Sequence, residues 1–238
     1  MQYIEFVNLY ENLSKTASRL EKTQILSGFL KKLKSHGKSE WIYLLKGRVF
    51  PDYDSREFGI SDKTTIKSIS KSSGVSEGEI MKRYKKIGDL GELAESFMEK
   101  RRQSTLFSSK LSTEKVFENL KKLAEIERKG AVGKKLSLIS EILNVASGKE
   151  AKYIVRTLLN DLRVGMADGT IRDSIAEAFF KDQNDVISKI EYAYDLANDY
   201  ALIFETASKG KKDLERIGII PGRPMKVMLP VKVTDIKE

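Results

Sequence analysis

Apolar residues along most of the chain recur every three or four positions, which is the spacing of one face of an α-helix. Clear examples lie at residues 26–33, 116–123 and 136–143, and a wider apolar stripe over 154–162 predicts a deeply buried helix. Three of the four prolines fall after residue 220, so little interrupts these helices. The pattern predicts about a dozen helices and no convincing strand before residue 220.

The sequence also indicates where helices begin and end. Ser18, Ser76 and Ser147 each precede a glutamate by three positions, which is the spacing of an N-terminal capping box. Glycines follow many of the periodic runs, as they do where helices end. Trp41 lies in a short apolar run and is expected in the core. These signals together predict an all-α fold.

The polar segment 101–112 interrupts the helical pattern. We therefore interpret it as a linker between a first helical half, residues 1–100, and a second, residues 113–218. Residues 219–238 are apolar and contain prolines, which predicts a short extended C-terminal tail. We expect this tail to have no partner within the helical bundle and to lead into a following domain.

The composition of 40% hydrophobic and 32% charged residues suits a soluble globular protein, and the charge narrows the choice of partners. A formal net charge of +9 favours a polyanion such as nucleic acid, or an anionic membrane. The alternative is a slightly basic protein with no charged partner.

Several kinds of site are excluded by residue counts. The chain has no cysteine, so disulfides, thiolate metal sites and cysteine nucleophiles are impossible. The only histidine, His36, stands among polar residues and is expected at the surface. No apolar run approaches the ~20 residues that span a bilayer, and the first residues do not resemble a signal peptide. We expect a cytoplasmic protein without a membrane partner.

Two glycine-containing turns concentrate basic residues. The first spans 127–135 and joins one apolar helix to the next. Small residues let the backbone approach a ligand closely, and the amides at the start of the following helix favour a phosphate. Its candidate binding residues are Arg128, Lys129, Gly130, Gly133, Lys134 and Lys135. The alternative is an ordinary turn with solvated lysines.

The second turn spans 162–170 and again ends a buried helix and begins another. Arg163 and Gly165 are its candidate binding residues. Two helix hairpins with basic, glycine-containing tips would suit the minor groove of a duplex, where sequence readout is poor. Such binding would be independent of sequence and sensitive to salt. Alone, this pattern is weak, because most glycine-containing helix turns bind nothing.

A family resemblance connects these turns. Leu162-Arg163-Val164-Gly165-Met166-Ala167 resembles the Leu-Arg-x-Gly-x-Ala signature in the DNA-binding domain of ATP-dependent DNA ligases. The segments 47–53, 57–60, 87–92, 151–156 and 221–229 resemble further patterns of the same family, in order and at matching spacings. The chain is similar in particular to the N-terminal domain of the archaeal-type enzymes.

The resemblance implies a helical domain, built as two related halves, that lies on the minor groove of nicked duplex DNA. The parent enzyme would seal nicks in DNA replication, repair and recombination. Both basic turns match the family's DNA-facing turns. The family's catalytic lysine stands in a Lys-x-Asp-Gly motif, which this sequence lacks. We therefore expect no cofactor or metal on this chain and no activity alone, with ATP and Mg²⁺ bound by a catalytic part beyond residue 238.

The linker resembles the short motif with which archaeal ligases bind a sliding clamp. Gln103 would fill a polar site, and Leu106 and Phe107 would enter an apolar pocket. Alternatively, Leu106 and Phe107 pack back on the domain. Two rival functions remain open: an all-helical adaptor that docks a clamp, with DNA binding incidental, and a complete small enzyme using Asp52 and Asp54.

Overall fold

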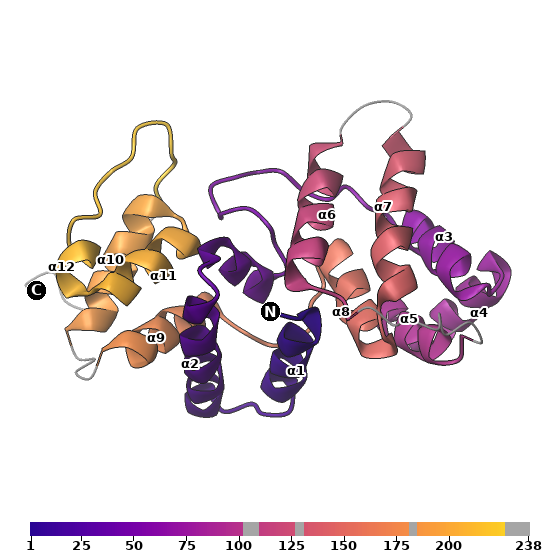
Figure 1. The fold of residues 1–238 in the computed structure, drawn as a ribbon, viewed down its shortest axis with the longest axis horizontal. Helices are drawn as coiled ribbons and strands as arrows, with labels where there is room; N and C mark the ends of the chain where they lie inside the picture. Colours follow the sequence, from indigo (N-terminus) through magenta and orange to yellow (C-terminus); the bar gives the residue numbers. More distant parts are fainter. Residues whose placement is uncertain (102–109, 127–130, 181–184, 227–238) are drawn as a thin grey trace, which may run out of the picture.

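The computed structural model describes residues 1–101, 110–126, 131–180 and 185–226, and helices dominate these ranges (Figure 1). The helices are α1 (Tyr3–Ser14), α2 (Arg19–Ser35), the 3₁₀ helix η1 (Ser39–Lys46), α3 (Asp62–Ser73), α4 (Glu77–Ile87), α5 (Leu90–Glu99), α6 (Thr113–Glu125), α7 (Ala131–Val145), α8 (Gly148–Leu158), α9 (Asp168–Phe179), α10 (Val186–Ala197), α11 (Tyr200–Lys209) and α12 (Lys211–Leu214). Within the described residues the sole β-type pairing is an isolated bridge between Gln2 and Ser112. The all-α prediction is confirmed.

The predicted helix starts lie where the sequence puts them. Ser18, Ser76 and Ser147 are all N-cap residues, and each side chain accepts a hydrogen bond from the amide three positions on. A full reciprocal box forms at Ser147, where the Glu150 carboxylate also accepts from the Ser147 amide at 2.9 Å. A side-chain cap of this kind satisfies amides that the helix itself cannot.

The helices form two groups in space, with α1 between them (Figure 1). In one group, α5 packs on α8 and α3 packs on α7. In the other, α2 packs on α9 and η1 packs on α11. Each group thus draws helices from both 1–100 and 113–218. The domain boundaries predicted from the sequence stay a prediction.

Helices α5 and α8 approach each other closely through two glycines. A Cβ on Gly91 would come within 2.9 Å of the Lys152 carbonyl, and a Cβ on Gly148 within 2.8 Å of the Glu95 carbonyl. Real Cβ atoms do not approach backbone oxygens so closely. Glycine at both positions therefore lets α8 lie directly against α5. This close packing fixes the position of α8, the helix that leads into the Arg163 turn.

The apolar run around Trp41 is buried, as expected, but it forms the 3₁₀ helix η1. The Tyr43 hydroxyl donates a 2.7 Å hydrogen bond to the Asp199 carboxylate, which also caps α11. His36 is the exposed C-cap residue of α2, in agreement with its predicted surface position. No helix among the described residues is long and apolar enough to cross a membrane.

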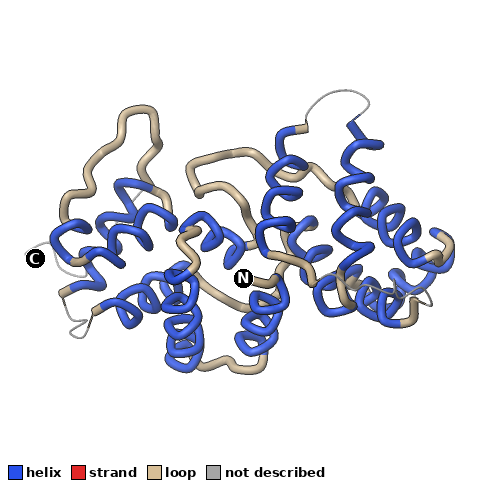
Figure 2. The backbone as a smooth tube through the Cα atoms, in the orientation of Figure 1, coloured by secondary structure: helices blue, strands red, loops and turns tan. Residues whose placement is uncertain are grey.

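The segment after α12 has partners in the bundle, contrary to the expectation for residues 219–238. Figure 2 shows it as one of the long loops outside the helices. The Lys226 amide donates to the Asp195 carbonyl at 2.9 Å, and the Arg223 guanidinium lies 3.5 Å from the Asp199 carboxylate. Lys226 Nζ also lies 3.5 Å from the Asp168 carboxylate. For residues 219–226 the prediction is wrong, because the apolar pattern of the tail does not reveal the carboxylates that Arg223 and Lys226 contact. Residues 227–238 lie outside the described residues.

Candidate nucleic-acid interface

The turn between α8 and α9 alternates buried and exposed positions. Leu162 and Val164 are buried, whereas Arg163 and Gly165 are exposed. Arg163 has φ +55° and Gly165 has φ +59°, a left-handed conformation that L side chains rarely adopt. The two apolar residues anchor the turn, so the two candidate binding residues are presented on the surface.

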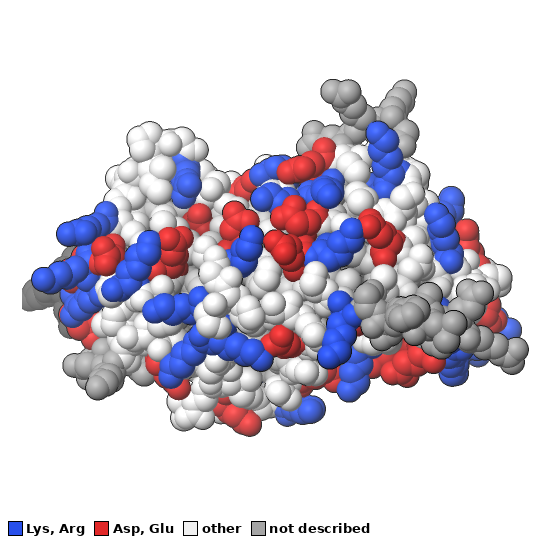
Figure 3. All heavy atoms as spheres, viewed as in Figure 1, with Lys and Arg blue, Asp and Glu red and all other residues white. Residues whose placement is uncertain are grey.

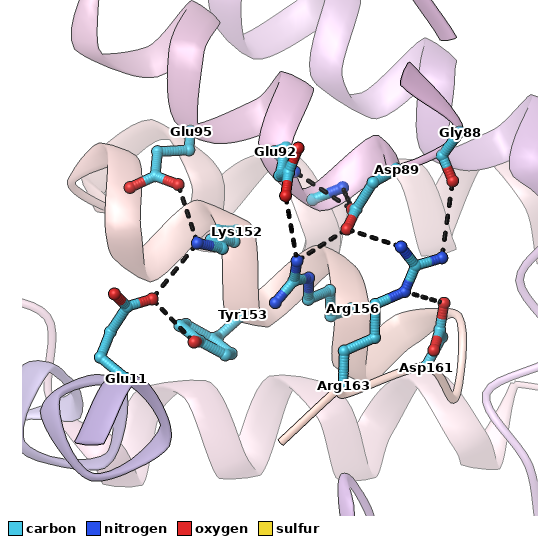
Figure 4. A network of polar contacts seen from close by, with 11 residues as sticks. Glu11, Gly88, Asp89, Glu92, Glu95, Lys152, Tyr153, Arg156, Asp161 and Arg163 are labelled. Atoms are coloured by element: carbon cyan, nitrogen blue, oxygen red, sulfur yellow. Dashed lines mark hydrogen bonds and ion pairs between the residues drawn. The ribbon is translucent and has the colours of Figure 1, made fainter. Parts of the chain in front are cut away.

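The guanidinium of Arg163 is held by acidic groups of the same molecule (Figure 4). Its Nε donates to the Asp161 carboxylate at 2.6 Å, and its Nη1 donates to Asp89 Oδ2 at 3.1 Å. The Arg163 side chain is 46% exposed. The structure therefore presents Arg163 at the surface, but as a side chain with internal partners that a phosphate would have to share.

Asp89 links this turn to the body of the domain. Its Oδ1 caps α5 by accepting from the Gly91 amide at 2.7 Å, and its Oδ2 accepts from Arg156 Nη2 at 2.7 Å. Burial alone would raise the pKa of Asp89, but hydrogen bonds and charge from Arg156, with those from the helix amides, outweigh burial and hold that pKa below its ordinary value. The aspartate of the 87–92 motif is thus an ionised cap that also holds Arg163.

The network continues from α8 to α1 (Figure 4). Lys152 Nζ lies 3.2 Å from carboxylates of both Glu11 and Glu95, so it connects α8 with α1 and α5. Tyr153 donates a 2.7 Å hydrogen bond to Glu11. These contacts fix the orientation of α8, and with it the start of the Arg163 turn.

The first candidate turn, at 127–135, is described only in part. Gly133 and Lys134 are exposed in the first turn of α7. Lys135 Nζ donates a 2.6 Å hydrogen bond to the Phe58 carbonyl, so this lysine connects α7 with the segment before α3. Arg128, Lys129 and Gly130 lie outside the described residues, as do Gln103, Leu106 and Phe107.

Residues 47–59 lie between the two turns. A Cβ on Gly47 would meet the Leu162 Cβ at 3.8 Å, and Phe58 contacts Lys135. A hollow of about 280 Å³ opens on this segment. Its lining residues are Lys46, Arg48, Val49, Phe50, Arg56, Glu57, Phe58 and Asn160. The two turns therefore border one common segment.

Asp52 and Asp54, the two aspartates considered as a catalytic pair, lie in the same segment. Each forms an ion pair with a different basic side chain. Asp52 lies 2.6 Å from Lys46 and accepts from the Tyr194 hydroxyl. Asp54 lies 2.6 Å from Arg56. These contacts account for both carboxylates as structural ion pairs, which weakens the hypothesis of a catalytic carboxylate pair.

Charge is spread over the surface. On the face shown in Figure 3, basic and acidic side chains alternate across the middle of the molecule. The net charge of +9 thus belongs to the whole chain and is not concentrated in one patch on this face. A positive net charge of this size attracts polyanions in general.

Comparison with known proteins decides the family. A sequence model described as "DNA ligase N terminus" matches residues 2–176. This chain belongs to that family. Similar relatives, each named DNA ligase, come from Thermococcus fumicolans at 36% identity, Methanobrevibacter smithii at 38% and Nanoarchaeum equitans at 35%. All of this chain is covered in each comparison, but only 42%, 43% and 41% of the respective relatives.

The part matched by the DNA ligase N-terminus model runs from α1 into α9, so it includes both candidate turns. The predicted archaeal ligase resemblance is confirmed. The chain spans about two fifths of the length of the relatives that it matches.

Sequence reasoning missed one residue of this DNA ligase N-terminal domain that contacts the second turn. Lys22 is buried, and its Nζ donates to the Val164 and Gly165 carbonyls. Lys22 stands four residues before Leu26 and eight before Leu30, on the same face of α2. The sequence does indicate this position, because a lysine at the four-residue spacing of buried leucines is expected to be buried with them.

Proposed function

We propose that this chain binds duplex DNA without sequence preference, through the minor groove, as the N-terminal part of an ATP-dependent DNA ligase that seals nicks. The observation that carries the proposal is the family match over residues 2–176, which includes both basic turns of a chain with net charge +9. Phosphate contacts from such turns position a protein on the duplex without reading its sequence.

The Arg163 turn supports this proposal by its shape. Gly165 has a backbone conformation that disfavours side chains, and its exposure leaves room for another backbone to approach. Because Leu162 and Val164 are buried and anchor the turn, the turn loses little conformational freedom when it binds a ligand. A preorganised turn of this kind suits a repeating phosphate backbone.

Gly133 supports the proposal in a different way. It lies within α7, yet a Cβ there would meet no atom of the described chain within 4 Å. Packing therefore does not require glycine at this position, although glycine weakens a helix by about 0.5–1 kcal/mol relative to alanine. Close approach of a ligand backbone would explain the residue.

The parent enzyme's chemistry is part of the proposal. The 238 residues contain no Lys-x-Asp-Gly motif, so we expect ATP and Mg²⁺ to act elsewhere in the parent protein and no adenylate to form on this chain. Clamp docking rests on the resemblance of residues 103–107 alone, outside the described residues, and stays a prediction.

Fluorescence anisotropy of the purified chain on a labelled nicked duplex, titrated with salt, tests the proposal. We expect binding that falls steeply with salt concentration, equal affinity for duplexes of unrelated sequence, and no adenylate when ATP and Mg²⁺ are added. Absence of binding at low salt would contradict the proposal and favour the clamp-docking adaptor. A stable adenylate would show that catalysis lies in this chain.

A further inference from the structure

Lys22 is a buried cation beneath the exposed turn between α8 and α9. It lies in the second turn of α2 and is 8% exposed. Its Nζ donates hydrogen bonds to the Val164 carbonyl at 3.2 Å and to the Gly165 carbonyl at 2.5 Å. Both acceptors are main-chain oxygens, and no carboxylate of the described residues forms an ion pair with this lysine.

These two hydrogen bonds determine where the neighbouring amides point. In a planar trans peptide, the carbonyl and the N–H of the next residue point in opposite directions. The Val164 and Gly165 carbonyls face Lys22, so the amides of Gly165 and Met166 face away from it. Neither amide has a hydrogen-bond acceptor among the described residues.

Two consecutive outward amides form a small site for an anion. Left-handed residues at φ +55° and +59° curve this turn, and successive amides in such turns form concave anion sites. The charge of Lys22, which no carboxylate of the described chain neutralises, adds positive potential beneath the same peptides. A phosphate oxygen can accept from both amides at once.

We propose that Lys22 is a positioning residue for DNA binding. It draws the Val164 and Gly165 carbonyls inward and thereby presents the Gly165 and Met166 amides to a backbone phosphate of the duplex. This inference rests on the proposed function, and it adds a residue that reaches the interface through the turn without touching DNA itself.

Replacing Lys22 with methionine tests this role, with Lys31→Met as the matched control. Both lysines lie in α2, and both changes lower the net charge equally, but Lys31 is exposed. We expect Lys22→Met to weaken nicked-duplex binding about tenfold more than Lys31→Met, the scale of one lost charge-assisted hydrogen bond. Circular dichroism would check that each variant is folded.

Hydrogen exchange at single amides separates positioning from general support of the fold. In the wild-type chain, the Gly165 and Met166 amides should exchange rapidly without DNA and slowly with it. In Lys22→Met, DNA should no longer protect them, while amides within α8 and α9 keep their protection. The Lys31→Met variant should retain the wild-type pattern.

Each outcome has a distinct meaning. Equal affinity and equal amide protection in the two lysine variants would overturn the role of Lys22 while the proposed function stands. If the wild-type chain itself fails to bind DNA, the proposed function fails first. Should Lys22→Met not fold, Gly165→Ala tests the same site, because its Cβ would come within 3.0 Å of the Lys22 Nζ at unchanged charge. Retained protection and affinity in that variant would also overturn the inference.

Discussion

Asp89 serves three elements with one carboxylate: it caps α5, binds Arg156 of α8 and holds Arg163 of the candidate interface. Arg156 is nearly buried, and removing the charge of Asp89 would leave it without its nearest carboxylate. Breaking a buried pair by removing one partner is more costly than the pair itself is stabilising.

We expect Asp89→Asn to lower the free energy of unfolding by about 3 kcal/mol at pH 7. The folded-state pKa of Asp89 is lowered, so its stabilisation is present above the unfolded pKa, about 3.9, and is lost as the pH falls through the folded value. Urea denaturation of both proteins at pH 7 and pH 3 checks this. The difference between them should shrink at pH 3, and a difference independent of pH would contradict the assignment.

Lys134 and Lys135 are neighbours in sequence with different structural roles. Lys134 is exposed, so Lys134→Ala should weaken DNA binding and reduce the salt slope by about 0.9, the value for one phosphate contact, at unchanged stability. Lys135→Ala removes the donor to the Phe58 carbonyl and should cost about 1 kcal/mol of stability. Anisotropy and urea denaturation of each single variant separate the two effects, and identical behaviour of both variants would refute the distinction.

At the scale of a helix, Gly133 in α7 and Gly28 in α2 form a natural comparison. A Cβ at either position would meet no described atom within 4 Å. Alanine should therefore stabilise the protein at both positions by up to about 1 kcal/mol, because it favours the helix. Only Gly133→Ala should weaken DNA binding. Thermal unfolding and anisotropy provide the two measurements, and unchanged binding by Gly133→Ala would show that the DNA backbone does not approach this glycine.

The features that could be predicted from the sequence are those determined by residues close together in the chain. The Ser147 box depends on residues three positions apart, and the buried stripe of α8 depends on helical spacing. Lys22 and Asp89 could not be assigned roles in the same way. Their partners lie 142 and 67 residues away, at Val164 and Arg156, and a stripe shows which face is buried without showing which helix covers it.

At the scale of the whole molecule, α1 packs on both α2 and α8 and so connects the two helix groups, which we expect to unfold together. Trp41 lies in η1, which packs on α11, and its fluorescence reports mainly on that group. Circular dichroism reports on all helices. The two signals should follow one urea transition with a common midpoint. Separate midpoints would show that the groups unfold independently.

Each helix group contains helices from both 1–100 and 113–218, and this arrangement also sets the order in which a nascent chain can fold. Helices α3 to α8 are consecutive, so their group can close once residue 158 has been synthesised. Helix α2 is made earlier but packs on α9, which ends at Phe179. At about 5–20 residues per second, its leucine face waits on the order of ten seconds for that partner. Helix α2 is therefore made before the α3–α8 group but completes its packing after it, and its apolar face needs protection from aggregation during that interval.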